Sequence, residues 1–178
     1  MMKLRLLAFL VAAAAIATFC MNFEAKAENY DLTVEVSGLH NFKGQVMLIL
    51  WPGQSEASKF PDPGKMQSRD EHDAGVVCDF QKYAICSRRV ESLQNLTVFY
   101  TFKSVPAGDY AVFVFHDENN NGILDTGLMN RPLEARGFSQ VLPEELKSLS
   151  RKIPFQRAKF NLSGPKTITV GLKYPPRL

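Results

Sequence analysis

The sequence predicts an all-β fold, an antiparallel β-sandwich of about seven to eight strands with one short helix. Two observations favour this class. Apolar residues recur with a period of two along most of the chain, whereas only one short segment has a helical pattern. Clusters of Gly, Pro, Asn and Asp separate the apolar runs and are typical of turns. An eight-stranded barrel is the alternative arrangement of these strands.

Residues 1–27 have the features of a signal peptide. Lys3 and Arg5 precede an apolar run that is too short to span a bilayer comfortably. Small residues follow in the pattern A-x-A, which suits a signal peptidase. We therefore expect cleavage between Ala27 and Glu28, and a periplasmic or secreted protein.

Two other fates of this leader stay open. Cys20 could carry a lipid anchor, although the bulky Phe19 before it disfavours such processing, or the segment could remain as a membrane anchor.

Cleavage would remove three of the 21 basic and one of the 18 acidic side chains, leaving a net charge of +1 rather than +3. This near-neutral balance does not point to nucleic acid. Residues 28–178 have the usual size of one domain and contain no further membrane span.

The first half of the domain begins with two predicted strands. In residues 32–38, LTVEVSG, apolar side chains alternate with polar ones, so one face is buried. Residues 44–53, GQVMLILWPG, are apolar on both faces and predict a central strand. Trp51 ends this strand, where we expect it in the core; an exposed tryptophan would instead suggest a sugar or protein contact. A polar insert with many turn residues follows at about residues 54–92.

Cys78 and Cys86 lie on two short candidate strands within this insert, around residues 76–80 and 84–90. An exported chain with two cysteines this close in sequence is expected to pair them as a structural disulfide. Zinc would need further ligands at suitable spacing, and a redox site of the CxxC type is absent from the sequence.

The second half predicts four more strands and the helix. Residues 95–105, NLTVFYTFKSV, are rich in β-branched and aromatic residues, and residues 109–117, DYAVFVFHD, are again apolar on both faces. Residues 143–150, PEELKSLS, predict the helix, with a proline and two glutamates in its first turn. Residues 157–174 predict a final hairpin that turns at residues 163–165.

The stretch HDENNNGILDTG contains the best candidate site. Its oxygen-bearing side chains follow the first three-quarters of a calcium loop, in which a glycine at the sixth position permits the sharp turn. A carbonyl oxygen at the seventh position and an acid folding back from outside the loop would complete the ligand set. The candidate ligands are Asp117, Asn119, Asn121, Ile123, Asp125 and Glu134.

Other interpretations of this loop stay open. Leu128 stands where a helix–loop–helix site would place a bidentate glutamate, so an EF-hand is excluded and a calcium affinity of about 10⁻⁴–10⁻³ M is expected. A plain β-turn explains the amides and the glycine, but not the alternating acids. A catalytic transition metal would prefer histidine or thiolate, and only His116 is close.

The runs PAGDYAVFVFHDENNNGILDTG, RPLEARGFS, PFQRAKFNLSG and TITVGLKY resemble the exported bacterial proteins grouped as domain of unknown function family 2141. The resemblance covers about residues 32–174, and the cysteine pair departs from it. It implies the architecture and the compartment, and that Glu134 with residues 132–139 packs beside the acidic loop. The P-x-G-x-Y strand is also similar to transthyretin-like sandwich modules, a likeness of fold only.

These observations predict a non-enzymatic, exported protein that binds a protein or polysaccharide of the cell envelope. The three histidines lie far apart in the sequence and outside any recognisable catalytic motif. The alternative is a small periplasmic hydrolase that uses His116 and Asp117. A histidine that ends a strand beside a turn more commonly has a structural role.

Overall fold

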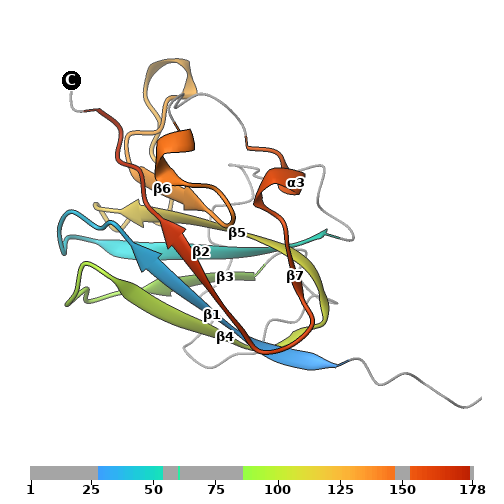
Figure 1. The fold of residues 1–178 in the computed structure, drawn as a ribbon. Helices are drawn as coiled ribbons and strands as arrows, with labels where there is room; N and C mark the ends of the chain where they lie inside the picture. The colour runs from blue at the N-terminus through green and yellow to red at the C-terminus, as the bar shows by residue number, and fades with distance from the viewer. Residues whose placement is uncertain (1–27, 54–59, 61–85, 147–152, 177–178) are drawn as a thin grey trace, which may run out of the picture.

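The computed structural model describes residues 28–53, 60, 86–146 and 153–176. In these residues eight strands form two sheets, with one four-residue helix, α3 (Phe155–Ala158), and two 3-10 turns, η3 (Leu128–Asn130) and η4 (Pro143–Glu145) (Figure 1). The predicted all-β class, with about seven to eight strands and one short helix, is therefore confirmed for the described residues, although the helix lies at other residues than predicted.

The first sheet has three strands in the order β4-β1-β8, and the second has five. The first sheet consists of β1 (Asn29–Ser37), β4 (Val98–Pro106) and β8 (Lys166–Gly171). The second follows the order β3-β2-β5-β6, with β7 also paired to β5, and consists of β2 (Gln45–Pro52), β3 (Cys86–Val90), β5 (Gly108–Asp117), β6 (Ala135–Phe138) and β7 (Phe160–Leu162).

The named strand pairs are antiparallel, as predicted, except that β8 runs parallel to β1. The final hairpin predicted at residues 157–174 is wrong. β7 pairs with β5 in one sheet and β8 pairs with β1 in the other, so the turn at residues 163–165 carries the chain between sheets. Leu162 and Ile168 both face the core between the sheets. A hairpin and an inter-sheet crossing produce the same alternation, which is why the pattern did not separate them.

The main core lies between the two sheets. On β1 the side chains of Leu32, Val34 and Val36 are buried there, as their alternation predicted. Facing them are the inward side chains of β2 and β5, such as Leu48 and Val114. Burial of this continuous apolar surface drives the two sheets together.

A second core covers the outer face of the five-stranded sheet. Trp51 on β2 and Phe113 on β5 point to this face. They pack with residues that follow β6 in the chain, such as Phe155 in α3. Trp51 is fully buried, with its ring 5.6 Å from that of Phe60 in an edge-to-face contact. The predictions that β2 and β5 are central strands buried on both faces, and that Trp51 is a core residue, are thus confirmed.

The helix predicted at residues 143–150 differs from the structure. Its first turn forms the three-residue η4, and residues 147–152 lie outside the described part. The Glu145 side chain accepts a hydrogen bond from the backbone N–H of Leu142 at 3.0 Å, a typical N-terminal cap. The four-residue α3 stands where the sequence predicted the start of the final hairpin.

Several predictions fall outside the described residues. These include the signal peptide at 1–27, the candidate strand at 76–80 and the Cys78–Cys86 disulfide, of which only the backbone of Cys86 is described, in β3. In the described ranges, no helix is long and apolar enough to cross a membrane.

Candidate functional site

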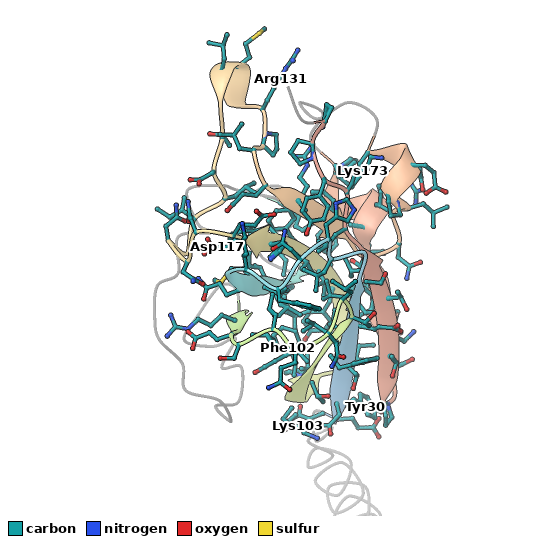
Figure 2. The ribbon with its side chains drawn as sticks, turned by 90° about the vertical axis from the view of Figure 1, so that its left-hand side faces the viewer. Tyr30, Phe102, Lys103, Asp117, Arg131 and Lys173 are labelled. Atoms are coloured by element: carbon teal, nitrogen blue, oxygen red, sulfur yellow. The ribbon has the colours of Figure 1, made fainter. Side chains whose placement is uncertain are left out.

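The acidic loop, residues 117–125, begins at the last residue of β5 and lies beside the start of β6 (Figure 2). Asp117 pairs in register with Gln45, the first residue of β2. The acidic loop therefore begins at the end of the β2–β5 strand pair. A polar loop is thereby held by two of the most buried strands in the molecule.

Asp117 organises the loop. Its side chain is fully buried, and its two carboxylate oxygens accept backbone hydrogen bonds from Asn121 at 3.2 Å and from Gly122 at 2.7 Å. The amide of Gln45 donates a third hydrogen bond, at 2.6 Å. These donors offset the loss of hydration that burial imposes on the carboxylate. Gly122 has a φ of +73° and Asn120 a φ of +61°, so the sharp turn predicted for the glycine is present.

The two loop amides form Asx turns. The side-chain oxygen of Asn119 accepts the N–H of Asn121 at 3.0 Å, and that of Asn121 accepts the N–H of Ile123 at 2.8 Å. Their NH₂ groups donate to opposite oxygens of Asp125, at 2.7 and 3.1 Å. The turn chemistry expected of Asn and Gly is therefore present in full.

Glu134 closes the site from outside the loop. It immediately precedes β6, is only 7% exposed, and accepts backbone hydrogen bonds from Glu118 at 3.2 Å and Asp125 at 3.0 Å. One carboxyl group thus joins the beginning and the end of the acidic loop. Its pKa is raised to about 7, mainly by burial and also by the charges of Asp117 and Asp125, against the lowering effect of the two N–H donors.

The structure brings the predicted ligands into one region without assembling a metal site. Among the described residues, no group of three or more His, Cys, Asp or Glu side chains is arranged to hold a metal ion. The Asp125 carboxylate is held by the two asparagine amides, while Glu134 accepts from the backbone. Ile123 keeps a 42% exposed side chain at the surface, and Leu124 packs against the second core and ties the loop to it.

His116 belongs to a buried polar group beside the loop. It is fully buried, with Nε2 2.6 Å from the carbonyl oxygen of Lys43 and Nδ1 2.5 Å from the hydroxyl of Tyr174. The Tyr174 ring stacks on His40 at 3.9 Å. Both imidazole nitrogens are therefore occupied by protein groups and neither faces solvent.

Two supporting residues were missed from the sequence. Gln45 and Tyr174 hold the side chains of Asp117 and His116, respectively. Gln45 had a usable signal, since it is a polar residue at the start of an otherwise apolar run. Tyr174 lies 58 residues beyond its histidine partner, and only the fold brings the two together.

Together, the fold and the loop define a β-sandwich protein with an acidic loop anchored on its central strands. The profile of the family described as "Uncharacterized protein conserved in bacteria (DUF2141)" matches residues 34–169, and the chain belongs to this family. The family expected from the sequence motifs is therefore confirmed. No curated protein and no solved structure matches the chain, and the transthyretin-like resemblance stays a prediction.

Proposed function

We propose that this protein is a non-enzymatic, exported binding module whose acidic loop binds calcium and is stabilised by it. The observation that carries the proposal is that three carboxyl groups are held around one short loop, those of Asp117 and Glu134 buried and that of Asp125 partly exposed. Among the described residues, no Lys or Arg side chain forms an ion pair with them. Like charges that share a poorly solvated region repel each other, and a bound cation relieves that repulsion.

The donor chemistry favours calcium over other cations. The candidate ligands offer carboxylate, amide and carbonyl oxygen, which hard cations prefer, with neither thiolate nor imidazole among them. Calcium accepts six to eight such ligands in irregular geometry. Magnesium would require a nearly ideal octahedron, which a curled loop with one acid from outside is poorly suited to supply.

Binding would require a small change within the loop. Asp125 would release the amide hydrogens of Asn119 and Asn121 and turn toward Asp117 and Glu134. The asparagine side-chain oxygens each keep a second lone pair that is free to face a cation. Breaking these hydrogen bonds opposes binding, which agrees with the expected weak affinity of about 10⁻⁴–10⁻³ M.

Export and partner are further parts of the proposal. The signal peptide predicted for residues 1–27 would take the protein to the periplasm or outside the cell, where calcium affinities in the millimolar range are of use. The partner would be a protein or polysaccharide of the cell envelope. The hydrolase alternative receives no support from His116, which is fully buried with both ring nitrogens occupied by protein groups.

The experiment is a thermal unfolding series of residues 28–178 in chelator and at increasing calcium concentrations. A ligand that binds only the folded state adds about 2.7 kcal/mol at one hundred times its dissociation constant. For a domain of this size, that corresponds to a rise in Tm of roughly 5–10 °C. Magnesium at the same concentrations should produce a smaller rise.

Two variants make the experiment specific. Asp125→Asn keeps the shape of a partly exposed ligand and should abolish most of the calcium-dependent rise. Asp31→Asn is the control, since Asp31 is an exposed carboxylate on β1 that pairs with Lys103 at 2.6 Å, away from the loop. A Tm that is insensitive to calcium in the wild-type protein would contradict the proposal, as would an equal rise in Asp125→Asn.

A further inference from the structure

A loop that follows the acidic loop protrudes from the sandwich and exposes large apolar side chains. This protruding loop, residues 126–133, includes η3, and Figure 2 shows it extending beyond the body of the molecule with Arg131 near its end. Leu128 is 88% exposed, Met129 75% and Leu133 60%. Single exposed leucines are ordinary, but three such side chains within six residues on one projection indicate an interaction surface.

The protruding loop is held in a defined conformation. Its two arms are joined by a bridge between Thr126 and Pro132, and the N–H of Gly127 donates to the carbonyl of Arg131 at 2.7 Å. Met129 sits at a φ of +59°, a left-handed conformation that is unfavourable for a residue with a side chain. Backbone strain at the turn and exposure of the apolar side chains are unfavourable for folding in water, so a role in binding accounts for both.

We propose that the protruding loop inserts Leu128, Met129 and Leu133 into the interface of a membrane that contains anionic phospholipid. A bilayer accepts a convex apolar projection without a matching pocket, whereas a protein partner must supply a concave one. Arg131 is the only charged residue in residues 126–133, whereas the flanking acids Asp125 and Glu134 lie at the base of the protruding loop and are hydrogen-bonded within the acidic loop. Its apolar stem can lie along the acyl boundary while the guanidinium contacts phosphate, so the charge favours anionic lipid.

This inference is independent of calcium binding. It depends on the protruding loop alone, and the apolar side chains are exposed without any metal. Elsewhere in the described residues, Phe99 is also strongly exposed, at 62%, but it lies on β4 of the other sheet. Phe99 therefore provides a matched control for the loss of an exposed apolar side chain.

The test is co-sedimentation of residues 28–178 with vesicles of phosphatidylethanolamine and phosphatidylglycerol, with phosphatidylcholine vesicles in parallel. We expect binding to the anionic vesicles that weakens with salt. The double variant Leu128→Ser with Met129→Ser should weaken it at least tenfold. Arg131→Gln should weaken it about fivefold and reduce its salt dependence. Phe99→Ser should bind as the wild type does. The experiment is run in chelator and repeated with calcium, and the loss in the double variant should occur in both conditions.

A second readout removes ambiguity about folding. The protein has one tryptophan, Trp51, and it is buried. In Leu128→Trp, a blue shift of the tryptophan emission on addition of anionic vesicles would place the tip in the apolar region. Absence of binding to either kind of vesicle would overturn the proposal and favour a protein partner. Equal binding by wild type and the double variant would also overturn it, as would a change of oligomeric state in that variant.

Discussion

Replacing Glu134 by glutamine should change the way in which stability depends on pH. The carboxyl group is 7% exposed and its pKa is raised from 4.5 to about 7, first by burial and then by the charges of Asp117 and Asp125. The folded chain therefore holds this proton more tightly than the unfolded chain does. In the absence of calcium, the contribution of Glu134 is fully favourable below pH 4.5 and is lost as the pH rises through about 7.

The magnitude follows from the two pKa values. A difference between 4.5 and about 7 corresponds to roughly 3 kcal/mol of unfolding free energy. Glutamine cannot ionise, but it replaces one of the two oxygens that accept from Glu118 and Asp125 by an NH₂ group, which costs about 1–2 kcal/mol. Glu134→Gln should thus be less stable than the wild type at pH 5, and equally or more stable at pH 8.

The assay is urea unfolding in chelator at intervals from pH 4.5 to 8.5. Wild type should lose stability across this range relative to Glu134→Gln. Glu145→Gln serves as the control, because the Leu142 N–H and Arg157 lower the pKa of Glu145. The Glu145 carboxylate therefore stabilises the folded protein at every pH above 4.5. This stabilisation is lost only as the pH falls below the range tested. Parallel curves for wild type and Glu134→Gln would refute the reasoning.

Two further substitutions test how the site is supported. Gly44→Ala should destabilise the fold by roughly 3 kcal/mol, measured by urea unfolding, since a Cβ would lie 1.9 Å from the carbonyl oxygen of Asp117 and the φ of Gly44 is +71°. The control is Gly164→Ala, which should be nearly neutral because the space around its Cβ position is open. Ser139→Ala should cost about 2 kcal/mol, measured by thermal unfolding, because the buried hydroxyl accepts from the N–H of Val112 at 2.8 Å and donates to a carbonyl of α3 at 2.6 Å. Ser139→Thr should retain part of that energy, because threonine keeps the hydroxyl. An unchanged Tm in Ser139→Ala would contradict a stabilising role of these two hydrogen bonds.

The strands could be predicted because neighbouring residues in the sequence show which side chains are buried, either by alternating between apolar and polar or by being apolar on both faces. Leu32, Val34 and Val36 face the core as their spacing required, and the two runs apolar on both faces became β2 and β5. The segment that covers the outer face of the five-stranded sheet could not be predicted in detail. Its helix α3 is four residues long, too short for a periodic signal, and tertiary burial of Phe155 stabilises it.

Pairing between strands was predicted less well than the strands themselves. The turn at residues 163–165 allows either a hairpin or a crossing between sheets, and the choice depends on which sheet has a free edge beside it. In the candidate site, the local turn at Asn121 and Gly122 was visible in the sequence. The contact of Glu134 with the loop was expected, because an acid shortly after the loop could fold back onto it, and the family resemblance supported this. The contact of Gln45 with Asp117 depends on strand register instead.

Calcium binding by the acidic loop is tested most directly by a titration of ¹⁵N-labelled residues 28–178 with calcium, followed by amide chemical shifts. We predict saturable shifts confined to residues 117–125 and 134, the largest at Gly122, whose N–H donates to Asp117, with a dissociation constant of about 10⁻⁴–10⁻³ M. The shifts should be absent in Asp125→Asn. A spectrum that is unchanged at about 10 mM calcium, roughly ten times the upper end of that range, would contradict the account, as would small shifts spread over surface carboxylates such as Asp31.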